Sequence, residues 1–71
     1  MQQYAVVIEH EGNSYGASVP DLPGCIAAAT TEGEVRKLIR EASAFHVRAM
    51  LEDGDLVPEP TTHVEYVALA S

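Results

Sequence analysis

The 71 residues of this chain are enough for one domain, expected over residues 1–71, and too few for two. Eleven acidic residues against four basic ones give a formal net charge of −7, which disfavours direct DNA or RNA binding by this chain alone. The sequence has no apolar run near the ~20 residues of a membrane span, no signal-peptide pattern at its start and a single cysteine, so we expect a cytoplasmic protein without disulfides.

Three short strands are predicted in the first half of the chain. Residues 4–10 (YAVVIEH) are rich in β-branched and aromatic residues, and residues 15–19 form a second short segment of this kind. The four-residue turn cluster between them, residues 11–14, predicts a hairpin. Residues 25–29 are predicted to form a third strand, although their alanine-rich composition gives a weaker signal.

The connection before the third strand contains the candidate partner-binding residues. Proline presets φ and glycine accepts positive φ, so a Pro-Gly pair suits the centre of a type II turn. Two interpretations of this connection remain open: an exposed recognition loop, or a stiff turn that sets the register of the strands. The candidates are Pro20, Asp21, Leu22, Pro23 and Gly24.

A single helix is predicted over residues 32–53. Thr31 and Glu34 have the spacing of a capping box at its start. Gly54 is a good residue for the position after its end, and Pro58 prevents continuation. Apolar residues recur at helical spacing and are expected on one buried face: Val35, Leu38, Ile39, Ala42, Phe45, Ala49 and Met50.

A fourth strand is predicted over residues 64–69, which gives the order β-β-β-α-β and an α+β fold. Short turns favour an antiparallel meander for the first three strands. The helix allows the fourth strand to return parallel to the first by a right-handed crossover. The expected sheet order is 3-2-1-4, with the helix on one face.

The candidate nucleophile and metal ligands are isolated in the sequence. Cys25 has no base or basic cluster nearby, so a small buried residue is favoured over a nucleophile. His10, His46 and His63 lack the spacing of a metal motif. We therefore expect no cofactor and no metal.

Three glutamates provide an enzymatic alternative. Glu9, Glu41 and Glu65 come from the first strand, the helix and the fourth strand, the elements that supply carboxylates to a two-metal ribonuclease-H-type site. A chain of this length lacks the further elements that would enclose such a site, and its charge repels nucleic acid. Solvated acidic residues are the favoured interpretation, and we expect no enzymatic activity.

Three stretches together resemble the HicB-like antitoxins of bacterial toxin–antitoxin pairs. They are YAVVIE with the following Ser-Tyr-Gly-Ala, VPDLPGC over residues 19–25, and EDGDLVPEP over residues 52–60. The VPDLPGC stretch is the most specific of them. The helix start departs from the family pattern at Gly33 and Val35, and Ala29 stands where glycine is frequent.

This resemblance implies a partial ribonuclease-H-like fold without ribonuclease activity. It also implies a partner: a HicA-type toxin, a small basic ribonuclease whose RNA-cleaving face the antitoxin covers. Many family members carry a C-terminal DNA-binding segment, whereas this chain ends after the predicted fourth strand, so no operator binding by the chain alone is expected. The alternative is a homo-oligomeric accessory or orphan domain without a toxin.

Self-association is predicted as well. Side chains alternate along a strand, and both sets of residues in the first and fourth strands are substantially apolar. A small domain without disulfides or metal also needs another source of stability. We expect a homodimer or a larger homo-oligomer that forms through the sheet face away from the helix or through edge strands.

Overall fold

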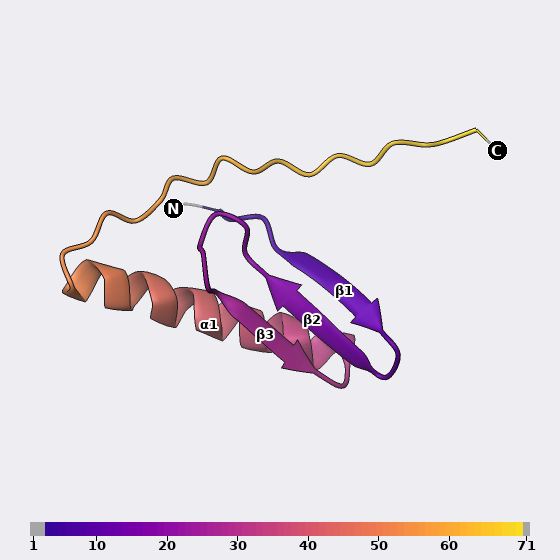
Figure 1. Ribbon diagram of the computed structural model, residues 1–71, viewed down its shortest axis with the longest axis horizontal. Helices are drawn as coiled ribbons and strands as arrows, with labels where there is room; N and C mark the ends of the chain where they lie inside the picture. Colours follow the sequence, from indigo (N-terminus) through magenta and orange to yellow (C-terminus); the bar gives the residue numbers. More distant parts are fainter. Residues whose placement is uncertain (1–2, 71) are drawn as a thin grey trace.

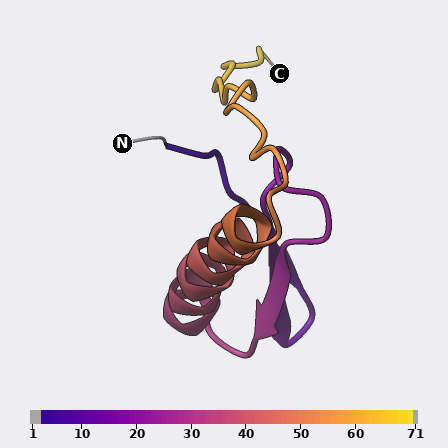
Figure 2. The same cartoon turned by 90° about the vertical axis from the view of Figure 1, so that its left-hand side faces the viewer.

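The computed structural model describes residues 3–70 and shows an antiparallel sheet with one helix on one face (Figure 1). The elements follow in the order β1 (Val7–Glu11), β2 (Ser14–Ser18), β3 (Ile26–Ala29) and α1 (Glu32–Glu52). The sheet order is β1-β2-β3. Figure 2 looks toward the end of the helix and shows helix and sheet as two layers. The predicted α+β class and the antiparallel meander are confirmed.

The hairpin between β1 and β2 has a two-residue turn. Glu11 pairs with Ser14, and Gly12 has a φ of 57°, as the first central position of a type II′ turn requires. Further along the ladder Ile8 lies opposite Ala17, which in turn lies opposite Ala27 of β3. This row faces the helix, because Ala17 is buried and the other two pack against the core.

Residues 19–25 form two successive turns that bring the chain from β2 to β3. The Leu22 amide donates to the Val19 carbonyl at 3.0 Å, and the Cys25 amide donates to the Leu22 carbonyl at 3.0 Å. Pro23 and Gly24 are the central residues of the second turn, and Gly24 has a φ of 84°. The predicted type II turn is therefore confirmed.

Helix α1 begins and ends at the predicted signals. The Glu34 amide donates to the hydroxyl of Thr31 at 3.1 Å, which is the first bond of the capping box. Gly54 follows the helix with a φ of 76°. The helix proper ends one residue earlier than predicted, at Glu52, and Asp53 caps it.

The predicted apolar face of the helix was too wide. Val35 and Ile39 are buried, but Phe45 is 70% exposed and Leu38 is also exposed. At about 100° per residue Phe45 lies roughly 120° around the helix from Ile39, beyond the stripe that faces the sheet. Val47, which was not in the predicted set, lies closer to that stripe and packs against the core.

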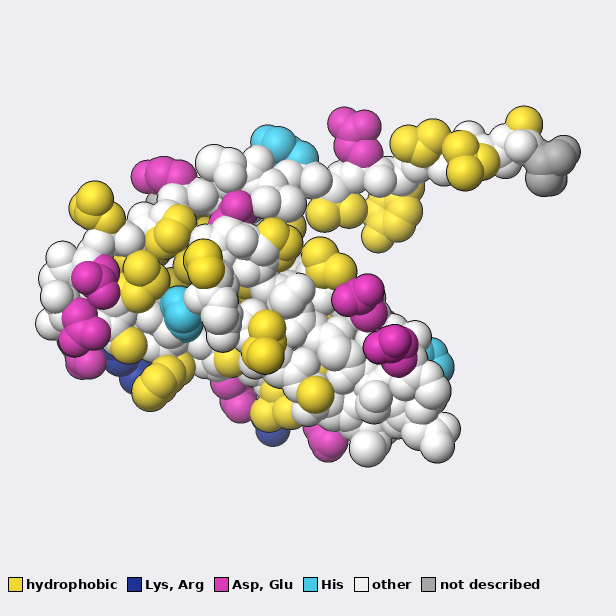
Figure 3. Space-filling model, viewed as in Figure 1, with side chains coloured by type: hydrophobic (Ala, Val, Ile, Leu, Met, Phe, Trp, Pro, Cys, Tyr) yellow, Lys and Arg dark blue, Asp and Glu magenta, His cyan; other side chains and the backbone are white. Residues whose placement is uncertain are grey.

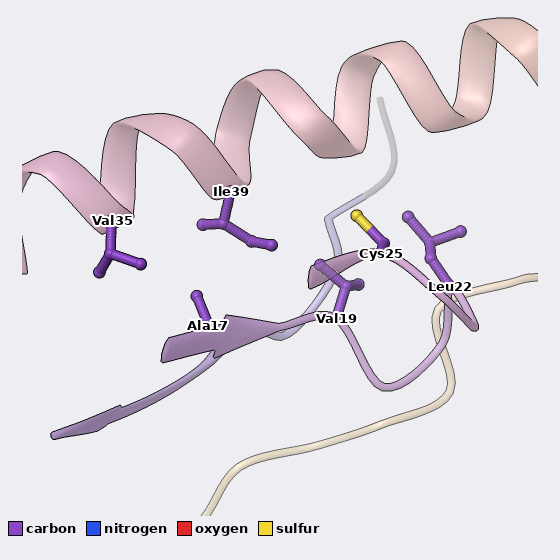
Figure 4. Packing of buried hydrophobic residues seen from close by; sticks show 6 residues of the cluster. All are labelled: Ala17, Val19, Leu22, Cys25, Val35 and Ile39. Carbon is purple, nitrogen blue, oxygen red and sulfur yellow. The ribbon is translucent and has the colours of Figure 1, made fainter. Parts of the chain in front are cut away.

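The core is small and lies between the helix, β2 and the turn of residues 19–25 (Figure 4). Cys25 is part of it, and its Sγ lies 3.6 Å from the hydroxyl of Ser43 on the helix. The buried residues are Ala17, Val19, Leu22, Cys25, Val35 and Ile39.

No fourth strand forms within residues 3–70, so the predicted order 3-2-1-4 is not confirmed. Residues 64–69 belong to no ladder and are exposed. We call residues 63–70 the C-terminal arm; it runs on the β1 side of the sheet and extends past the body of the domain (Figure 1). These residues have no pairing partner within the described chain, and a strand needs one to be stable.

Candidate protein-binding site

Asp21 anchors the chain just before the C-terminal arm. Its Oδ2 accepts hydrogen bonds from the amides of Thr61 and Thr62 at 3.1 and 3.0 Å. Its Oδ1 accepts from the two threonine hydroxyls at 3.1 and 2.8 Å. The Thr62 amide bond is the largest of the influences that hold the pKa of Asp21 below its usual value, and desolvation opposes them in part.

A second contact fixes the same part of the chain. The hydroxyl of Tyr4 donates to the carbonyl of Pro58, which joins the segment before β1 to the segment after α1. Pro58 receives this contact six residues after Glu52, the last residue of the helix. Together with the Asp21 bonds it fixes the base of the arm at two points.

The five candidate partner-binding residues have different surroundings. Leu22 is fully buried and Asp21 is occupied by the threonines, so neither presents a free side chain. Pro20, Pro23 and Gly24 are exposed at the rim of the loop. The sequence did not indicate the role of Asp21, because its partners lie 40 residues away and nothing in the spacing links them.

An open groove separates β1 from the helix. The helix packs mainly over β2 and β3, so the inward Ile8 of β1 is only partly covered. Tyr4, Val6 and Ile8 form one wall, and Ile39 and Ser43 lie on the other wall. The groove has a volume of about 430 Å³, and the helix residues Arg36 and Arg40 also line it.

The C-terminal arm carries large apolar side chains into solvent. Tyr66 is 96% exposed and Leu69 is 86% exposed, with Val64 and Val67 also exposed. Figure 3 shows hydrophobic side chains along the arm, which projects from the body of the protein. Apolar residues that are clustered and exposed in this way are typical of protein-binding surfaces.

Charge is unevenly distributed along the chain. The Lys and Arg residues of the sequence all lie on α1, while the acidic residues occur on every element except β2 and β3. Arg36 pairs with Glu32 at 2.6 Å, one helical turn away, in an exposed ion pair that contributes little stability. Strand β1 and the end of the helix therefore carry acidic side chains that suit a basic partner.

The structure does not assemble the candidate enzymatic residues into a site. Glu9 is on the sheet face away from the helix, Glu41 is exposed on the helix, and Glu65 is on the arm. Within residues 3–70 no cluster of three or more His, Cys, Asp or Glu side chains is arranged to hold a metal ion. Cys25 is buried, as the preferred interpretation had it.

These features define a small α+β module with an exposed apolar arm, an open groove and an acidic surface, which is the construction of a protein-binding domain. The chain belongs to the HicB-like antitoxin family of bacterial toxin–antitoxin systems, whose family model matches residues 4–70. The resemblance seen in the sequence is thereby confirmed.

A curated relative is known from a bacteriophage. The chain is 38% identical over 64 residues to an uncharacterized 14.9 kDa protein in the rep-hol intergenic region of Haemophilus phage HP1. The match covers 90% of this chain and 48% of the relative, so the chain spans about half the length of that protein. No solved structure matches the chain significantly. In the part of the chain that the structure describes, no helix is both long enough and apolar enough to cross a membrane.

Proposed function

We propose that this chain is a cytoplasmic antitoxin that neutralises a small basic HicA-type ribonuclease toxin by binding it and covering its RNA-cleaving face. The observation that carries the proposal is the family match over residues 4–70. Membership of an antitoxin family also favours a role without enzymatic activity. The proposal concerns this domain, because the curated relative is about twice as long.

Charge supports a basic partner. A net charge of −7 on 71 residues produces a field that attracts a basic protein and repels RNA. Such complementarity raises the association rate more than it raises the affinity, and salt screens it. The proposed antitoxin would therefore associate rapidly with its toxin and would not bind the RNA that the toxin cleaves.

The turn of residues 19–25 supplies a rigid rim for the contact. The Leu22 side chain packs in the core, and Asp21 accepts hydrogen bonds from the two threonines. These contacts fix the loop and keep the exposed Pro20, Pro23 and Gly24 in one conformation. A surface that is already ordered loses little entropy on binding. We place the partner contact on this rim, with Asp21 and Leu22 as residues that shape it.

A four-stranded sheet in the order 3-2-1-4, as in a partial ribonuclease-H-like fold, remains part of the proposal. The free edge of β1 and the open groove beside it are the place where a fourth strand would lie. That strand would have to be supplied by a rearranged arm or by another chain.

A second candidate function is an orphan homo-oligomeric domain that has no toxin. The exposed apolar arm favours it, because self-association would bury Tyr66 and Leu69 without any other partner. The two functions differ in what the protein binds in its own cell.

A pull-down from the native cell distinguishes them. The tagged chain is expected to retain a small basic protein encoded beside its own gene, and the retained amount should fall when salt is raised during association. Recovery of nothing but further copies of this chain would favour the orphan domain. An equally acidic, unrelated protein of similar size is the control for non-specific charge attraction.

A further inference from the structure

Among residues 3–70 no strand pairs with β1 on the side away from β2, so β1 is an edge of the sheet. In a two-residue hairpin the residues that flank the turn form a hydrogen-bonded pair, here Glu11 and Ser14, and such pairs alternate along the ladder. The backbone groups of Ile8 and His10 therefore point away from β2, toward the open side. An uncovered edge of this kind is a template for pairing with another strand.

The groove beside this edge is positioned to accept the inward side chains of one more strand, and its lining is largely apolar. Val6 and Ile8 form its sheet wall and Ile39 lies on its helix wall. A strand added beside β1 would extend the sheet over this space, and every second side chain of that strand would point into it. The added strand would form hydrogen bonds with the outward backbone groups of β1 and would fill the groove at the same time.

The C-terminal arm has the properties of such a strand. Its eight residues contain no proline or glycine, and residues 64–69 (VEYVAL) combine β-branched, aromatic and aliphatic side chains. At about 3.3 Å per residue the arm is longer than β1. Glu65 is the only acidic residue in the arm, and the groove is lined by two of the four basic residues, Arg36 and Arg40.

In residues 3–70 the arm forms no strand ladder with the β1 edge of its own chain. Its base is fixed by Asp21 on Thr61 and Thr62, and from there the arm runs along the β1 side of the sheet and extends past the domain (Figures 1 and 3). Tyr66 is 96% exposed, although it lines, together with Ile8 and His10, a space beside β1 of its own chain.

The other open face of the sheet is a weaker candidate for self-association. Beyond Val7 and Ile26 it presents small or charged residues on the side away from the helix. Those residues are Glu9, Glu11, Ser14, Gly16, Ser18 and Ala28. The arm and the β1 edge together offer more apolar surface and unpaired backbone.

We propose that two copies of this chain exchange their C-terminal arms, each arm pairing with the β1 edge of the other copy and covering its groove. Reciprocal exchange gives a closed twofold dimer in which every arm and every edge is used. The fourth position of each sheet is then filled by the partner subunit. This dimer does not depend on a toxin.

Sedimentation equilibrium at micromolar concentration tests the exchange. The wild-type chain is expected at twice its 7.6 kDa mass. Tyr66→Asp and Val67→Asp place a charge on the two alternative faces of the arm, and at least one of them should weaken the dimer about tenfold or more. Leu56→Asp, an exposed residue outside the arm, is the matched control and should leave the dimer intact.

Mixing variants separates arm exchange from other dimers. Val6→Asp damages the groove but keeps the arm, whereas the effective arm variant keeps the groove. Neither should dimerise well alone, and their mixture should form a heterodimer through the one intact contact. A wild-type chain that stays at 7.6 kDa, a dimer unaffected by both arm variants, or a mixture without heterodimer would overturn the proposal.

Discussion

Leu22→Ala probes whether the turn of residues 19–25 is part of the core. The Leu22 side chain is completely buried, and it packs with Val19 and Cys25 in the same cluster as the helix residues (Figure 4). The substitution removes three carbon atoms, which at about 0.8 kcal/mol each costs about 2.4 kcal/mol in transfer free energy. A residual cavity adds to this, so we expect a loss of about 3 kcal/mol in the free energy of unfolding.

The effect should be large in a domain of this size. For 60–100 residues each kcal/mol corresponds to a shift of about 4–8 °C in Tm, so the variant should melt about 12–24 °C below the wild type. Leu56→Ala is the matched control, because Leu56 is 93% exposed and its removal should change stability by less than about 0.5 kcal/mol. Thermal melts at equal protein concentration measure both. Equal melting temperatures would refute the placement of Leu22 in the core.

Three further predictions concern the turn, the base of the arm and nucleic acid. Gly24→Val should lower the Tm more than Asp21→Ala does. Valine at position 24 would strain a backbone with positive φ by about 1–3 kcal/mol, whereas the contacts of Asp21 lie outside the core. Equal melting temperatures of the two variants would contradict the turn assignment. The lowered pKa of Asp21 means that its contacts are fully present above the unfolded-state pKa of about 4 and are lost as pH falls through the lower folded-state value. Hydrogen exchange of the Thr61 and Thr62 amides should accordingly lose protection at acidic pH, and Asp21→Asn should abolish this pH dependence; unchanged protection in acid would argue against the anchor. The purified chain should not shift duplex DNA that carries its own promoter, given its net charge of −7; a shift that weakens with added salt would show the opposite.

Local signals predicted most of the fold. The hairpin, the Pro23-Gly24 turn, the Thr31 cap and the Gly54 helix end each depend on residues within a few positions of one another. Their conformations are determined by φ preferences and short-range hydrogen bonds. Such features can be predicted without knowledge of the tertiary structure.

The parts that could not be predicted depend on distant partners. The arm has strand propensity, but whether it forms a strand depends on the availability of an edge, and propensity does not say which chain supplies it. Asp21 meets Thr61 only because the chain after the helix runs back past the turn. Phe45 is exposed because the short sheet covers only a narrow stripe of the helix, and the helical period alone does not give that width.

The central claim is tested most directly by an RNA-cleavage assay with the toxin encoded beside this gene. With the toxin held constant and this chain titrated in, cleavage should fall in proportion to the added chain and stop near equimolar amounts. An unrelated protein of equal charge should have no such effect. Undiminished cleavage at a several-fold excess of the folded chain would contradict the assignment of this protein as an antitoxin.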